Sequence, residues 1–174
     1  MKRLTLVRHA HAKVQAAAVT DFERPLSRRG RAEAKATALS LLRADAVPQL
    51  LLASAARRTL QTAEIFAREL KIAERHVHQD ELLYLAAPDT ILKLIHATGP
   101  RIEHLMVIGH NPGISALANA LAPQAKLGEF ATAAACIMDI DVRTWPAVSA
   151  GCVKSARQIS GAARLFGLFK QKRG

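Results

Sequence analysis

Residues 4–12 read LTLVRHAHA, an apolar run that ends abruptly in Arg8, His9 and His11. Residues 4–7 are typical of a short buried strand. Burial alone gives no reason to place a cation and two imidazoles at the end of such a strand. The same pattern occurs at two later places in the chain, and together the three places predict both the fold and the site.

Two later apolar strands also end in polar residues. Residues 49–53 lead to Ser54, with Arg58 four positions further on, and residues 105–108 lead through a glycine to His110. The carboxyl ends of parallel strands meet at one edge of a sheet, and ligands bind at that edge. If the three strands are parallel neighbours, their histidines and arginines converge on one pocket.

Helical patterns separate the predicted strands. Helices are predicted for residues 27–44 with Ser27 as N-cap, for 55–71, for 88–97 and from the 109–113 turn to about 121, and residues 77–83, 133–140 and 152–159 are predicted to be extended. This alternation predicts an α/β domain, a three-layer sandwich with a mostly parallel central sheet flanked by helices. We expect residues 1–159 to form this domain. Residues 160–174 are expected to be a basic C-terminal tail, in which a packed or frayed helix is favoured over a membrane or partner contact.

The chain has 174 residues, 50% of them apolar, and a formal net charge of +11. This length suits one domain with a sizeable core. The charge favours anionic partners, either a phosphorylated protein or a small phosphate substrate. No zinc-finger or helix-turn-helix spacing and no alternation of aromatic and basic residues is present, so we do not expect a nucleic-acid partner.

Cysteine content and hydropathy suggest the compartment. Cys136 and Cys152 are widely spaced, which favours reduced thiols over a disulfide framework. The apolar run after Met1 is too short for a signal core, and no later segment is long enough to span a bilayer. We therefore expect a cytoplasmic protein with no membrane contact.

Arginines gathered around imidazoles indicate that the pocket binds a phosphoryl group. A guanidinium matches phosphate oxygens two at a time and stays charged at any working pH. One histidine can attack phosphorus and become a phosphohistidine, while the arginines neutralise the transferred group. Pro112 is expected in the first turn of a helix whose N-terminus attracts anions, with Asn111 as a substrate-binding residue. This chemistry requires neither a metal nor another cofactor.

Four motifs, taken in order, resemble the histidine phosphatase superfamily, which has a phosphoglycerate mutase-like fold. They are Arg8-His9, Arg24-Pro25-Leu26-Ser27-Arg28-Arg29-Gly30, Ser54-x3-Arg58-x2-Gln61-Thr62-Ala63 and Gly109-His110-Asn111-Pro112. Within the superfamily the chain most resembles the SixA-type phosphohistidine phosphatases, over about residues 3–158. The resemblance implies that His9 is the phosphorylated nucleophile. It also implies that Arg8, Arg58 and His110 hold the phosphoryl group.

The chain departs from the family pattern after the Arg-His pair. Ala10 stands where the family usually has glycine, and its methyl group costs about 1 kcal/mol if the backbone there needs a positive φ. His11 stands where an acidic residue often follows, and we expect a solvated loop histidine rather than part of the pocket entrance. Arg57, beside the motif arginine, is expected to be a surface charge.

No motif marks a carboxyl group as the general acid. Hydrolysis of a phosphate ester expels an alkoxide that needs a proton, and Asp21, Asp80 and Glu81 are the candidates. A phosphohistidine substrate instead releases an imidazole, which accepts protons near neutral pH. The lack of an obvious acid therefore favours an N–P bond over a C–O–P bond.

The favoured hypothesis is a metal-independent phosphatase that forms a phosphohistidine intermediate and acts on phosphohistidine in a protein. The spans between the motifs are short and leave no large lid, which predicts an open site. Three alternatives remain. They are a phosphatase of small phosphorylated metabolites, a metal site made of His9, His11 and His110, and a non-catalytic phosphate-binding module.

Overall fold

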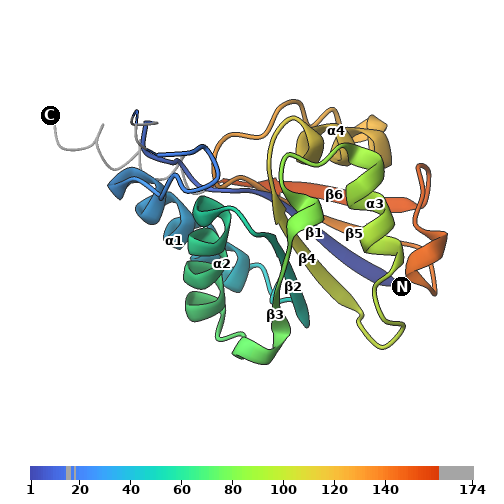
Figure 1. Ribbon diagram of the computed structural model, residues 1–174. Helices are drawn as coiled ribbons and strands as arrows, with labels where there is room; N and C mark the ends of the chain where they lie inside the picture. The colour runs from blue at the N-terminus through green and yellow to red at the C-terminus, as the bar shows by residue number, and fades with distance from the viewer. Residues whose placement is uncertain (15–16, 18, 161–174) are drawn as a thin grey trace, which may run out of the picture.

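A computed structural model describes residues 1–14, 17 and 19–160 of the chain. Its centre is a six-stranded sheet in the order β3-β2-β4-β1-β5-β6 (Figure 1). The strands are β1 (Lys2–Arg8), β2 (Leu50–Ser54), β3 (Val77–Asp80), β4 (His104–Gly109), β5 (Ala135–Ile140) and β6 (Val153–Ile159). The first four are parallel to one another, whereas β5 pairs antiparallel with both β1 and β6. The predicted mostly parallel sheet is confirmed.

Helices cover both faces of the sheet, which gives the predicted three layers (Figure 1). They are α1 (Arg28–Arg43), α2 (Arg57–Leu70), α3 (Pro88–His96) and α4 (Gly113–Leu121), with 3₁₀ turns η1 (Glu74–His76), η2 (Glu81–Leu83), η3 (Pro123–Ala125) and η4 (Trp145–Ala147). Helix α1 begins where the sequence predicted, because the Ser27 side chain accepts a hydrogen bond from the Gly30 amide at 3.0 Å.

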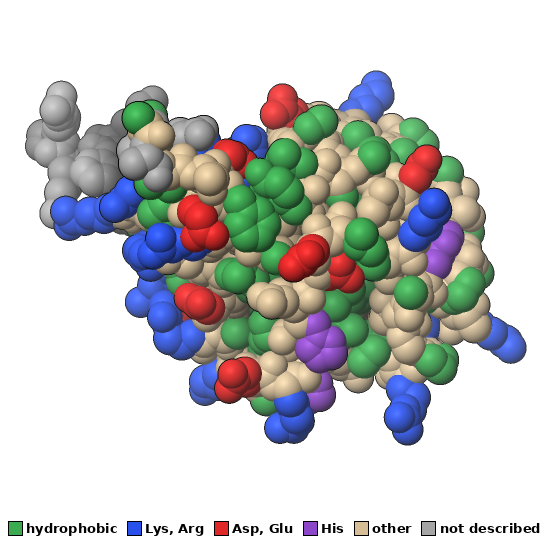
Figure 2. All heavy atoms as spheres, in the orientation of Figure 1, with side chains coloured by type: hydrophobic (Ala, Val, Ile, Leu, Met, Phe, Trp, Pro, Cys, Tyr) green, Lys and Arg blue, Asp and Glu red, His purple; other side chains and the backbone are tan. Residues whose placement is uncertain are grey.

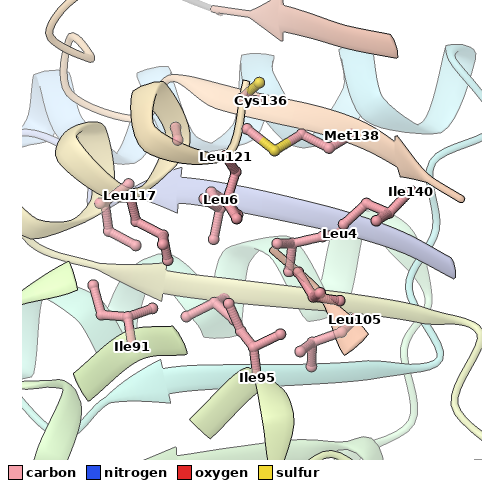
Figure 3. Packing of buried hydrophobic residues seen from close by; sticks show 14 of the residues in the cluster. Leu4, Leu6, Ile91, Ile95, Leu105, Leu117, Leu121, Cys136, Met138 and Ile140 are labelled. Atoms are coloured by element: carbon pink, nitrogen blue, oxygen red, sulfur yellow. The ribbon is translucent and has the colours of Figure 1, made fainter. Parts of the chain in front are cut away.

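The core consists of two apolar clusters, one on each face of the sheet. Leu4 and Leu6 of β1 pack with Ile95 in the cluster beneath α3 and α4, and Figure 3 shows this packing. Val7 belongs to the opposite cluster, with Phe66 of α2. Burial on both faces explains why these strands are continuous apolar runs rather than alternating ones.

Two predicted boundaries were wrong. The segment predicted as extended to residue 83 leaves the sheet at Asp80, because the Asp80 carboxylate accepts a hydrogen bond from the Leu82 amide at 2.8 Å and begins η2. Pro112 is the N-cap of α4 rather than part of its first turn, and it follows a cis peptide bond from Asn111. Helix α4 therefore starts at Gly113.

Three other expectations concern the cysteines, the membrane and the C-terminal tail. Cys136 and Cys152 are both free thiols. Within residues 1–14, 17 and 19–160, no helix combines the length and apolar character needed to cross a membrane. Apart from Ser160, the predicted basic tail lies outside the described residues.

Candidate active site

The pairing of β1 with β4 brings two of the predicted residues together. The strands are parallel neighbours in a register that sets Arg8 opposite Gly109. His9 and His110 therefore leave the same edge of the sheet side by side, with ring centroids 5.1 Å apart. The His9 amide donates to the Gly109 carbonyl at 3.0 Å, which holds the two strand ends together.

Arg58 connects the two imidazoles. It lies in the first turn of α2, just after β2, and its side chain is only 4% exposed. Its Nε donates to His9 Nε2 at 3.2 Å, and its Nη2 lies 3.2 Å from His110 Nδ1. Arg57 is exposed, as predicted. The convergence predicted from three strand ends is therefore present.

The contacts with Arg58 fix the tautomers of both rings, because a guanidinium only donates hydrogen bonds. In His9, Nε2 is the acceptor, so Nδ1 carries the proton and donates to the Ala10 carbonyl at 2.8 Å. In His110, Nδ1 is the acceptor, so Nε2 carries the proton and donates to Ser54 Oγ at 2.7 Å. The two rings are thus held as opposite tautomers, with the unprotonated nitrogens both facing Arg58.

Both imidazoles are neutral at physiological pH. Burial is the largest cause that lowers the pKa of His9 to about 4; the hydrogen bond to Ala10 opposes it, and the charges of Arg58 and Arg8 act in the same direction as burial. Burial likewise lowers the pKa of His110 to about 3, with His9 and Arg58 as further causes. A neutral His9 keeps Nε2 unprotonated, as a nucleophile requires; in this structure its lone pair accepts the hydrogen bond from Arg58 Nε.

Two further arginines add positive charge near His9. Arg8 donates through Nη1 to the Phe130 carbonyl at 2.6 Å, and Arg24 pairs with Asp21 at 3.2 Å. Among the described residues, the Nε groups of Arg8 and Arg24 are the buried side-chain nitrogens without a hydrogen-bond partner. Both charges lower the pKa of His9. Arg24 was not among the predicted site residues, although its place in the 24–30 motif was the available signal.

Asp21 is the one acid candidate that contacts this group of residues. Its Oδ2 accepts hydrogen bonds from Arg58 Nη2 and from the Tyr84 hydroxyl, both at 2.9 Å. The Tyr84 ring packs edge-on against His110 at 5.4 Å. Glu81 is exposed on η2, and the Asp80 carboxylate caps that turn. Nothing in the sequence pointed to Tyr84.

The pKa of Asp21 lies below its ordinary value. Burial by itself raises this pKa, but the hydrogen bond from Tyr84 and the charges and hydrogen bonding of Arg58 and Arg24 outweigh that effect. The group is therefore a carboxylate at neutral pH.

Asn111 has side-chain contacts away from the two imidazoles. Its amide nitrogen donates to the Phe130 carbonyl at 3.0 Å and to Glu129 at 3.2 Å, and its amide oxygen accepts from Ser115 at 2.7 Å. The side chain therefore holds the loop that also contacts Arg8.

His11 differs from its expected solvated state. It is half-buried, and its Nδ1 lies 2.8 Å from the hydroxyl of Ser27, the N-cap of α1. In the described part of the chain, no group of three His, Cys, Asp or Glu side chains is placed to hold a metal ion. The donor set proposed for a metal, with His11 beside His9 and His110, does not come together.

Ala10 fits its position without strain. Its side chain is fully buried, and its φ is outside the left-handed region. Its amide donates to Thr62 Oγ1 at 3.1 Å. The alanine in place of the family's glycine therefore carries no backbone penalty, which removes one reason for considering a non-catalytic module.

Comparison with known proteins gives the family. The model of the histidine phosphatase superfamily (branch 1) matches residues 4–84. An uncharacterized chloroplastic protein of Arabidopsis thaliana is 34% identical over 120 residues, which cover 64% of this chain and 55% of that protein. The chain spans between 55% and 63% of the length of the curated relatives it matches.

Solved structures match over more of the chain. A protein assigned as the phosphohistidine phosphatase SixA of Agrobacterium tumefaciens is 30% identical, with a TM-score of 0.74 over 80% of this chain and 92% of that one. The histidine phosphatase SixA in complex with tungstate shares the fold, with 22% identity and a TM-score of 0.79 over 93% of this chain and 99% of that one. The chain belongs to the histidine phosphatase superfamily and is SixA-like in architecture.

Proposed function

We propose that this protein is a metal-independent phosphatase that works through a phosphohistidine intermediate on His9. The proposal rests above all on one observation: His9 Nε2 and His110 Nδ1 both face the same edge of the Arg58 guanidinium. A phosphoryl group between the two rings meets an unprotonated nucleophile on one side and charge-assisted donors on the other.

The reaction has two steps. First, the Nε2 lone pair of His9 forms a bond to phosphorus while the bond to the leaving group breaks. The leaving atom keeps that electron pair and takes up a proton from water. Then water attacks the phosphorus of phosphorylated His9, the Nε2–P bond breaks, inorganic phosphate leaves, and the proton of the water passes to the solvent.

The arginines stabilise charge in both steps. Arg58 is buried and Arg8 partly buried, so their attraction for phosphoryl oxygens is less screened than at an open surface. The Nε groups of Arg8 and Arg24, which have no hydrogen-bond partner within the described part of the chain, are donors that phosphoryl oxygens can satisfy. His110 completes the set once the anion draws a proton to Nδ1, because a negative charge beside an imidazole raises its pKa.

The substrate is proposed to be phosphohistidine in a protein. Its leaving imidazole needs less help from an acid than an alkoxide does. That matches a site in which Asp21, the carboxyl group in contact with Arg58, has a lowered pKa and is ionised. Exposed cations on α1 and at the start of α2 would attract an acidic phosphoprotein; they are Arg28, Arg29, Arg31, Lys35 and Arg57. Lys and Arg side chains gather on this side of the molecule in Figure 2.

The proposed compartment is the cytoplasm. The free thiols of Cys136 and Cys152 are consistent with reducing surroundings.

The decisive experiment measures phosphate release from a phosphohistidine protein and from several small phosphate esters side by side. We expect faster turnover of the protein substrate, retained in the presence of a chelator. Equal or faster turnover of the small esters would instead assign the enzyme to small phosphorylated metabolites. Loss of activity with the chelator would contradict metal independence.

A second experiment tests the intermediate. Enzyme incubated with a labelled phosphoryl donor and quenched in alkaline detergent should carry label that is stable in base and lost in acid, which is the behaviour of phosphohistidine. His9→Ala should abolish both label and turnover. Label without release of phosphate would indicate a phosphate-accepting module rather than a phosphatase.

A further inference from the structure

The guanidinium of Arg58 is used along two different edges. Its Nε and Nη2 form the edge that faces His9 and His110. Its Nη1 and Nη2 form the other edge, which faces Asp21: Nη1 donates to the Asp21 carbonyl oxygen, and Nη2 donates to Oδ2 at 2.9 Å. The Nη1–Nη2 edge, here called the rear edge, is therefore held by Asp21, while the Nε–Nη2 edge, here called the front edge, points between the imidazoles.

Asp21 is itself held in place. The hydroxyl of Tyr84 donates to Oδ2 at 2.9 Å, and Arg24 approaches Oδ1 at 3.2 Å. The Tyr84 ring is packed edge-on between Phe22, at 5.0 Å, and His110, at 5.4 Å. Oδ2 thus accepts hydrogen bonds from residues 37 and 63 positions away in sequence, and Oδ1 is ion-paired with Arg24.

We propose that Asp21 is a positioning residue and not the proton donor: it anchors the rear edge of Arg58 so that the front edge meets the phosphoryl group between His9 and His110. Tyr84 holds the carboxylate in turn. This inference rests on the proposed function, since it assigns a role in phosphoryl transfer. An arginine without such an anchor samples many rotamers. Each unproductive orientation that it populates reduces the fraction of molecules ready for transfer.

A general acid needs a proton to give and a free path to the leaving atom. The Asp21 carboxylate accepts hydrogen bonds from Arg58 and Tyr84 and forms an ion pair with Arg24, and these contacts stabilise its charged form. A proton donor and an anchor therefore make different predictions for the same substitution, Asp21→Asn.

The first test is a double-mutant cycle with Arg58→Lys, which keeps the charge but removes the two-edged fork. In the otherwise native enzyme, Asp21→Asn should lower kcat/KM about tenfold or more, and in the Arg58→Lys background the same change should cost less than about twofold. Equal losses in both backgrounds would show that Asp21 acts independently of Arg58 and would overturn the proposal.

The second test uses aryl phosphates whose phenols differ in pKa. If Asp21 positions Arg58, Asp21→Asn should reduce kcat/KM by a similar factor across the series. If Asp21 donates the proton, the loss should grow steadily as the leaving group becomes more basic. A growing loss would overturn the proposal.

Calorimetric binding of tungstate, a phosphate analogue, separates this inference from the proposed function. Asp21→Asn should weaken tungstate binding about tenfold in the native background and less than about twofold with Arg58→Lys. If tungstate affinity changes as expected in these variants but the native enzyme turns over no substrate, the proposed phosphatase activity is refuted and the role of Asp21 as anchor of Arg58 is retained. Tungstate affinity unchanged by Asp21→Asn, or no tungstate binding by the native enzyme, would refute the anchor.

Matched variants serve as controls. Glu23→Gln removes one negative charge from an exposed residue of the same segment and should change kcat/KM and tungstate affinity less than about twofold. Asp21→Glu keeps the carboxylate and should restore part of the activity lost in Asp21→Asn. Should Asp21→Asn fail to fold, Tyr84→Phe gives the same test, with a smaller loss that disappears in the Arg58→Lys background.

Discussion

At the scale of single residues, His9 and His110 differ in which ring nitrogen carries the proton, because Arg58 donates to a different nitrogen in each ring. Nitrogen-15 spectra at about pH 7 should therefore show neutral His9 protonated on Nδ1 and neutral His110 protonated on Nε2. Since the pKa values lie at about 4 and about 3, both rings should stay neutral when the pH falls to about 5.5. A histidine with an ordinary pKa near 6.5 is about nine-tenths protonated there. A His9 signal that titrates near 6.5 would contradict this assignment.

Arg24 gives a second prediction at this scale. Its Nε is buried without a partner among the described residues, and its charge acts on His9. Arg24→Gln should therefore weaken tungstate binding by about tenfold or more, the cost of a hydrogen bond to a charged group. Arg101→Gln removes the same charge from an exposed turn before β4 and should leave the affinity within about twofold. Similar effects of both variants would mean that only the net charge matters.

At the scale of elements, α1 depends on a close approach to the segment after His9. A Cβ on Gly30, in the first turn of α1, would collide with the backbone carbonyl of His11, whereas a Cβ on Gly99 would meet nothing within 4 Å. Gly30→Ala should therefore lower the free energy of unfolding by about 1–3 kcal/mol, even though alanine favours a helix. Gly99→Ala should change it by less than about 0.5 kcal/mol. Urea unfolding measures both, and equal effects would contradict the close packing.

The elements also show what sequence could predict. The ends of β1, β2 and β4 could be placed because apolar runs and strand-end residues are local signals, and the parallel pairing then brings His9 to His110. The contacts by which Asp21 and Tyr84 hold Arg58 could not be predicted from local signals of this kind. Asp21 and Tyr84 reach each other across 63 residues of sequence, and neither has a local pattern that marks its partner. The strand end at Asp80 was missed because a single side-chain hydrogen bond ends the strand there.

At the scale of the whole molecule, the buried His104 and His110 and the half-buried His9 make stability depend on pH. The pKa values of His9 and His104 are lowered to about 4 and that of His110 to about 3, with burial as the largest cause in each. A histidine whose pKa is lower in the folded state takes up a proton on unfolding. The stability it contributes is therefore complete above its unfolded pKa, near 6.5, and is lost as the pH falls toward about 4.

His104 allows this dependence to be tested away from the candidate active site, because it begins β4 at the opposite edge of the sheet. Its Nδ1 donates to the Val47 carbonyl at 3.1 Å and its Nε2 accepts from the Thr5 hydroxyl at 2.8 Å. His104→Gln can keep both contacts without titrating, so the variant should lose less stability in acid. Urea unfolding at several pH values should show the native advantage over the variant shrinking by about 1.4 kcal/mol per pH unit below 6.5. A constant difference between the two proteins down to about pH 4.5 would place the folded-state pKa of His104 at its ordinary value and refute the prediction.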